Sequence, residues 1–185
     1  MPGHLALLLH AHLPFVRHPE HEHVLEENWL YEAIVETYLP VVQIMDGWLR
    51  HGMDTRLTLS LSPTLCAMLD DPLLQQRYRK HLDNLIELAE KEVHRTQWEQ
   101  SFQGLARFYL DRFNRTRDLY LACQGNLVRE FKKHQDLGNI EIITCAATHA
   151  VLPLLQDPAA IRAQVFVGCQ DYRHRFGRNP RGIWL

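Results

Sequence analysis

Four short apolar runs alternate along the chain with longer stretches in which apolar residues recur every three or four positions. Runs of this length are typical of strands buried on both faces, and the longer spacing is typical of amphipathic helices. The alternation predicts an α/β fold of parallel strands joined by right-handed helical crossovers. The predicted strands cover 4–10, 56–62, 140–146 and 181–185.

Proline and aspartate mark the boundaries of the helices. Asp71-Pro72 and Asp157-Pro158 each supply an N-cap side chain followed by a proline in the first turn. Pro40 lies inside the first helical stretch and should kink it or divide it in two. No repeat or linker interrupts the pattern, so we expect one unit over 1–185 with no internal domain boundary. The predicted helices cover 26–52, 72–94, 104–134 and 158–176.

Histidines lie where two of the predicted strands end. His10 ends the first run, His12 follows two positions later, and His149 follows the third run. The two-residue repeat of a strand directs His10 and His12 to the same side. The carboxyl ends of parallel strands are where α/β proteins bind their ligands. We therefore expect the three histidines to share one pocket.

The second predicted strand alternates leucines with small hydroxyl side chains. Thr58, Ser60 and Ser62 occupy one parity of this strand. Small hydroxyl groups suit a crowded barrel interior or the floor of a site better than open solvent.

The residue types in this pocket are compatible with two kinds of chemistry. Three histidines can bind Zn²⁺ and leave a coordination position open, as in a metal-dependent deacetylase-like hydrolase. Neutral imidazoles can instead hold sugar hydroxyls and position a carboxylate, because they both donate and accept hydrogen bonds. The first strand lacks the carboxylate that usually accompanies a metallohydrolase His-x-His. The sequence therefore favours a site without a metal or other cofactor.

Charge and cysteine content exclude several classes of protein. The net charge of −2 and the pI near 6.6 provide no basic surface for nucleic acid or for anionic membranes. The four cysteines form no CxxC pair and lie in apolar contexts, as in a reduced cytoplasmic protein. The apolar stretch of 5–9 is too short for a signal peptide or a membrane span. We expect a cytoplasmic protein.

Four segments together resemble one family of enzymes. His10-Ala-His12-Leu-Pro14-Phe15 resembles the first signature of glycoside hydrolase family 57, and 138–153, which contains His149, resembles the second. Pro180-Arg-Gly-Ile-Trp184-Leu185 is similar to the opening of the third. The block 27–34, Glu-Asn-Trp-Leu-Tyr-Glu-Ala-Ile, is most similar to the branch that contains 1,4-α-glucan branching enzymes.

The resemblance implies a (β/α)7 TIM-like barrel, a retaining mechanism, an α-glucan substrate and no metal. Residues 1–185 would form the N-terminal portion of that barrel. In the family, the nucleophile is a glutamate just after the Gly-Ile-Trp-Leu strand, and the acid/base is an aspartate much further on. Both are expected beyond Leu185, so we expect no catalytic carboxylate in 1–185 and no activity of this segment alone, which would need the rest of its barrel.

The resemblance also assigns roles to residues that are present. His10, His12 and His149 form the active-site shell, and Trp29 and Trp184 bind substrate. Trp29 opens a helix near the expected rim, where an aromatic ring suits stacking on a sugar, although its spacing also fits a core anchor.

Several functions remain open at this point. Glycosyl transfer from α-1,4 to α-1,6 positions by a branching enzyme is the first. An α-amylase or a 4-α-glucanotransferase of the same family, a deacetylase-like metallohydrolase and a non-catalytic carbohydrate-binding protein are the alternatives.

Overall fold

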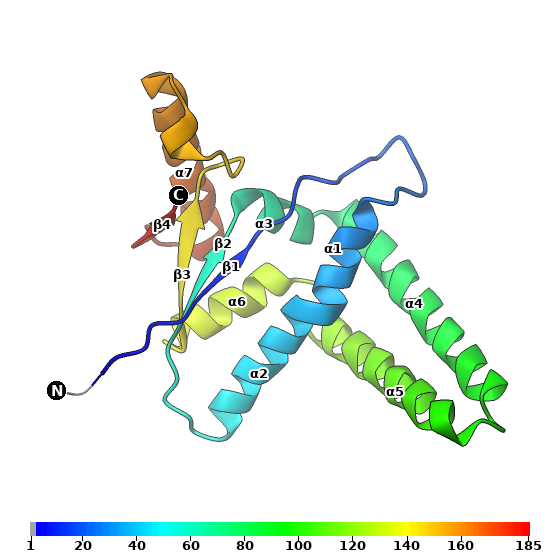
Figure 1. The fold of residues 1–185 in the computed structure, drawn as a ribbon. Coiled ribbons are helices and arrows are strands. Elements are labelled where there is room, and N and C mark those ends of the chain that lie inside the picture. The colour runs from blue at the N-terminus through cyan, green and yellow to red at the C-terminus, as the bar shows by residue number, and fades with distance from the viewer. Residues whose placement is uncertain (1–2) are drawn as a thin grey trace.

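The computed structural model describes residues 3–185 and contains a parallel sheet of four strands in the order β1-β2-β3-β4 (Figure 1). Each strand lies beside the strand that follows it in the sequence, which is the arrangement that successive βα units produce in a barrel. The prediction of parallel strands with helical crossovers is confirmed. The strands are β1 (Leu8–Ala11), β2 (Leu57–Leu61), β3 (Ile140–Cys145) and β4 (Ile183–Trp184).

The first strand is shorter and more exposed than predicted. Its ladder begins at Leu8, which pairs with Thr58, because β2 itself begins only at Leu57. Leu8 and Leu9 are 40% and 45% exposed, so the prediction of a strand buried on both faces is wrong for this chain. β1 lies at the edge of the sheet and has a strand neighbour on one side only among residues 3–185.

The helices follow the predicted order with two differences. A short helix that begins at Pro63 was not expected, and Ser62 caps it by accepting a hydrogen bond from the Leu65 N–H. The predicted helix over 104–134 is two helices. The elements are α1 (Glu27–Ala33), the π-helical η1 (Ile34–Tyr38), α2 (Leu39–Arg50), α3 (Pro63–Leu69), α4 (Pro72–Arg95), α5 (Gln100–Ala122), α6 (Leu127–Asp136), the 3₁₀ turn η2 (Leu152–Leu154) and α7 (Pro158–Phe176).

Pro40 divides the first helical stretch, as predicted. It has no N–H for the carbonyl of Glu36, and its ring would crowd that carbonyl in a regular α-helix. The preceding turn adopts π geometry instead, with the Leu39 N–H bonded to the Ile34 carbonyl.

The break between α5 and α6 lies at Gln124 and Gly125, which both have positive φ angles of 54° and 72°. A Cβ on Gly125 would lie 3.0 Å from the Tyr120 hydroxyl, so glycine suits both the turn and the contact. The periodicity that predicted one helix continues across this break because both helices bury apolar residues in the same core, as Tyr120 and Leu127 do.

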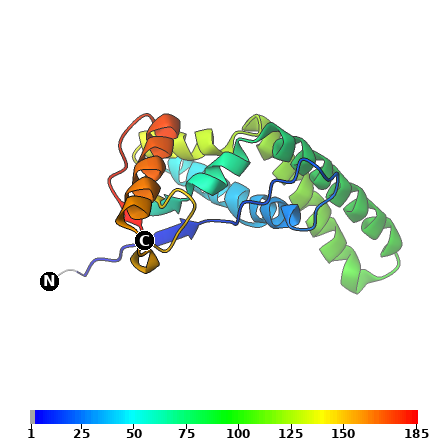
Figure 2. The same cartoon turned by 90° about the horizontal axis from the view of Figure 1, so that it is seen from above.

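One core joins the sheet to the helices around it. It contains Leu59 and Ile142 from the strands, Val42 from α2 and Phe131 from α6, all nearly inaccessible to solvent. The α4–α5 pair extends away from the sheet in both views (Figures 1 and 2). Among residues 3–185, no helix combines the length and the hydropathy needed to cross a bilayer.

Candidate active site

His10, His12 and His149 meet at the carboxyl end of the sheet, as predicted. The Nε2 atoms of His10 and His149 lie 2.7 Å apart. The ring of His12 stacks on that of His149 with centroids 3.7 Å apart and planes 11° apart. His149 therefore contacts His10 through a ring edge and His12, just after the first strand, through a ring face.

Hydroxyl groups of the second strand and its following turn hold the first two histidines. Ser60 Oγ lies 3.1 Å from His10 Nδ1, and Ser62 Oγ lies 2.9 Å from His12 Nδ1. Thr64 Oγ1 is 3.3 Å from the same nitrogen of His12. The sequence indicated hydroxyl groups at the floor of a site, but it did not indicate which histidine each would bind. The parallel register decides this, since it pairs His10 with Ser60.

The loop that carries His149 is fixed to α7. Its backbone at Ala147 donates to the carbonyl of Gln164, and the Gln164 side chain exchanges two hydrogen bonds of 2.9 Å with Thr148. Gly168 on the same helix allows a close approach, because a Cβ there would lie 2.5 Å from the Cys145 carbonyl oxygen. His149 itself has a φ of 57°, an uncommon conformation for a residue with a side chain.

The electrostatics of the cluster keep two imidazoles neutral. Burial and the nearby His149 lower the pKa of His10. Burial, reinforced by His149 and His10, lowers the pKa of His12 to about 4. At neutral pH these two rings are thus uncharged and able to donate at one nitrogen and accept at the other.

The two tryptophans predicted to bind substrate lie in different surroundings. Trp184 of β4 stacks on His10 with ring centroids 5.3 Å apart, and it is 41% exposed. Trp29 lies in the first turns of α1 and is 49% exposed, so it is not the buried core anchor that its spacing also allowed. No aromatic contact within residues 3–185 joins Trp29 to the histidines.

The histidine geometry favours hydrogen bonding over metal coordination. Ligands of one metal ion direct their ring nitrogens at a common point. His12 and His149 instead lie face to face, and no group of three His, Cys, Asp or Glu side chains in the described chain is arranged to hold a metal ion. That the protein works without a metal stays a prediction.

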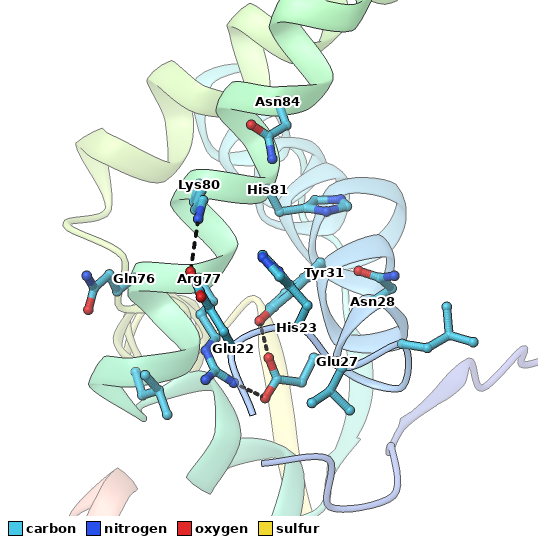
Figure 3. Close-up of a pocket in the computed structure, with 13 residues that line it drawn as sticks. Glu22, His23, Glu27, Asn28, Tyr31, Gln76, Arg77, Lys80, His81 and Asn84 are labelled. Carbon is cyan, nitrogen blue, oxygen red and sulfur yellow. Dashed lines mark hydrogen bonds and ion pairs between the residues drawn. The ribbon is translucent and has the colours of Figure 1, made fainter. Parts of the chain in front are cut away.

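A second polar site, which the sequence did not reveal, lies between α1 and α4 (Figure 3). Glu27 is 2% exposed and accepts hydrogen bonds from Arg77 at 2.5 Å and from the Tyr31 hydroxyl at 2.8 Å. Arg77 also donates to the carbonyl oxygens of His18 and His21, which ties the loop between β1 and α1 to α4. The network forms one wall of a cavity of about 670 Å³. The i, i+4 spacing of Glu27 and Tyr31 was the available signal, since it places both on one helix face.

Comparison with known proteins gives both an α-amylase and branching enzymes as relatives. The solved α-amylase AmyC from Thermotoga maritima is 45% identical, with a TM-score of 0.95, over 100% of this chain and 35% of that chain. The solved GH57-type branching enzyme from Pyrococcus horikoshii is 33% identical, with a TM-score of 0.93, over 99% of this chain and 34% of that one. The 1,4-alpha-glucan branching enzyme of Thermococcus kodakarensis is 31% identical over 185 residues, which are 27% of its length.

These likenesses confirm the predicted fold class, the N-terminal portion of a TIM-like barrel. The chain spans only about a third, or less, of the length of each of these relatives. The sequence pattern of glycosyl hydrolase family 57 matches residues 6–185, nearly the whole of what the structure describes. The chain belongs to glycosyl hydrolase family 57.

Proposed function

We propose that this chain is part of a retaining enzyme acting on α-glucans and that it supplies the histidine shell of the active site. The observation that carries the proposal is the meeting of His10, His12 and His149 at the carboxyl end of a parallel sheet. The shared family of the relatives supports the substrate class.

Retention of anomeric configuration requires two carboxyl groups about 5–5.5 Å apart. We assign both to the chain beyond Leu185, with a glutamate soon after β4 as the nucleophile and a later aspartate as the acid/base. The position of β4 supports this assignment. It runs parallel to β3, and Trp184 stacks on His10, so the segment that follows β4 leaves the sheet beside the histidines.

The side chains of this chain then have specific tasks. His10, His12 and His149 form a hydrogen-bonded shell for sugar hydroxyls and the nucleophile carboxylate, and the neutral rings of His10 and His12 add no positive charge of their own. Trp184 provides a half-exposed ring beside His10, and Trp29 provides a second ring at the start of α1 for stacking on a glucose unit. No metal or other cofactor takes part in the proposed reaction.

We assign branching as the specific reaction, that is, transfer of an α-1,4-linked segment to a 6-hydroxyl group. The named branching enzymes among the relatives support it. Hydrolysis is the second candidate, because the α-amylase AmyC is the relative with 45% identity. Transfer and hydrolysis share the glycosyl-enzyme intermediate and differ in whether a sugar hydroxyl or water resolves it.

We also assign the protein to the cytoplasm. The four cysteines are free thiols, and Cys66, Cys123 and Cys145 are buried, as expected in a reducing compartment.

The test is to incubate the full-length protein with amylose and to quantify α-1,6 linkages by proton NMR alongside reducing ends. New α-1,6 linkages with few new reducing ends support branching, whereas reducing ends without α-1,6 linkages support α-amylase. Longer linear chains at a constant number of reducing ends would support 4-α-glucan transfer. Binding of amylose without any change in it would support a non-catalytic carbohydrate-binding protein. Residues 1–185 alone should show none of these activities.

A further inference from the structure

The two fully buried serines beside the histidines differ in what their hydroxyl protons can reach. Ser60 and Ser62 are both 0% exposed, and each lies beside a histidine Nδ1 atom. Ser62 also accepts from the Leu65 N–H and lies 3.1 Å from Thr64 Oγ1, so its proton has two acceptors available. Ser60 has one side-chain partner in the described chain, which is His10 Nδ1 at 3.1 Å.

This difference fixes where the proton of His10 lies. A buried hydroxyl group without an acceptor costs about 1–3 kcal/mol, so the Ser60 proton is directed at His10 Nδ1. A nitrogen that accepts this hydrogen bond carries no proton of its own. Neutral His10 therefore carries its proton on Nε2.

The contact between His10 and His149 also depends on where the proton of His10 lies. Two ring nitrogens 2.7 Å apart must share one proton, because two N–H groups would clash and two lone pairs would repel each other. With the proton on His10 Nε2, the Nε2 atom of His149 is the acceptor. Hydrogen bonding then runs in one direction, from the Ser60 hydroxyl through the ring of His10 toward the rim of the sheet.

We propose that Ser60 is a positioning residue, which holds His10 as the Nε2–H tautomer and so directs its one N–H at His149 Nε2, which fixes the orientation of His149 at the rim of the sheet. The inference rests on the proposed function for the expected effect on turnover. It rests only on the geometry around His10 for the tautomer itself.

The sign of the pH effect follows from the direction of the hydrogen bond. A hydroxyl that donates to Nδ1 stabilises neutral His10, so its removal should raise the pKa of this ring. The titratable groups that face His10 are His149 at its Nε2 and His12, whose ring centroid is 6.3 Å away. Within residues 3–185 neither of them hydrogen-bonds to Ser60, so changing Ser60 removes no hydrogen bond of theirs.

The experiment compares Ser60→Ala with Thr58→Ala in the full-length protein. Thr58 lies on the same strand and the same face of the sheet as Ser60, but it comes two residues earlier and so lies further from the carboxyl end of the strand. With amylose as substrate, Ser60→Ala should lower kcat roughly three- to tenfold with little change in KM, as expected for a lost hydrogen bond. It should also shift the acid limb of the pH profile of kcat/KM to higher pH. Ser60→Thr should return this limb to its position in the unmodified protein. Thr58→Ala should do neither.

A second measurement does not depend on turnover or on how well Ser60→Thr folds. In the ¹⁵N-histidine spectrum of the unliganded protein, His10 should show a protonated Nε2 and an unprotonated Nδ1, and Ser60→Ala should change this pattern. A protonated Nδ1 in the unmodified protein would overturn the proposal, as would an unchanged acid limb in Ser60→Ala. If the expected spectrum is found without activity on any α-glucan, the proposed function fails and the tautomer assignment stands.

Discussion

His10 and His149 are 139 positions apart in the sequence, yet their Nε2 atoms lie 2.7 Å from each other. The parallel arrangement of β1, β2 and β3 brings both to the same end of the sheet, and α7 fixes the loop that carries His149. The contact joins the first strand to the loop after the third strand, across the intervening β2, so the site forms only when the sheet is assembled.

Replacing either histidine should impair turnover more than stability. In the full-length protein, His10→Ala and His149→Ala should each lower kcat on amylose by about 10²–10³, the usual cost of disrupting a hydrogen-bonding group that acts in the transition state. The melting temperature should fall by only a few degrees, because both side chains lie at the rim. Activity retained together with a large loss of melting temperature would instead identify them as structural histidines.

Acid should destabilise the protein partly through His12. Its folded-state pKa of about 4 lies below the ordinary value of 6.5, so the unfolded chain binds more protons between these two pH values. The stability that neutral His12 contributes is therefore present above pH 6.5 and is lost progressively as the pH falls toward 4. His12→Asn should make the melting temperature less dependent on pH over this window. Identical pH dependence in the two proteins would contradict the assignment.

Purified protein should contain well below one zinc ion per chain. Because His12 and His149 pack face to face, their ring nitrogens do not point at one common position where a metal ion could bind. Elemental analysis after dialysis against a zinc-containing buffer tests this. Stoichiometric zinc that disappears in His10→Ala would support the deacetylase-like metallohydrolase.

The buried pair of Glu27 and Arg77 should be important for stability. Arg77→Met leaves the 2% exposed carboxylate without its cation, which should cost about 3–5 kcal/mol in the free energy of unfolding. The control is Lys91→Met, because the Lys91–Glu87 pair is 68% and 63% exposed. That change should cost less than about 1 kcal/mol. Equal effects of the two changes in denaturant titrations would show that breaking the buried Glu27–Arg77 pair costs no more than breaking an exposed pair.

Gly168 should tolerate no side chain. A Cβ there would lie 2.5 Å from the Cys145 carbonyl, so Gly168→Ala must move α7 away from β3 at a cost of about 1–3 kcal/mol. Activity should fall as well, because α7 holds the loop of His149. Gly104→Ala is the control, since this helical glycine has nothing within 4 Å of its Cβ position. It should stabilise the protein by about 0.5–1 kcal/mol, and a stabilising effect of Gly168→Ala would refute the close-approach argument.

The sequence by itself determined the elements whose signals are local. Asp71 and Asp157 cap α4 and α7 as predicted, and Pro40 divides the first helical stretch, because capping and proline geometry depend on a few neighbouring residues. The parity of the strand placed His10 and His12 on one side for the same reason. Local motifs also carried the family resemblance, which the comparison confirmed.

Only the tertiary structure decided what depends on partners distant in sequence. β1 begins at Leu8 because β2 begins at Leu57, and the division of 104–134 follows from a turn that packs Gly125 against Tyr120. The pairing of Ser60 with His10 follows from the register between two strands separated by a long crossover. These contacts depend on geometry summed over many residues, and short-range patterns do not encode that geometry. Hydrophobic periodicity reports which face of an element is buried, but it does not report which side chain that face meets.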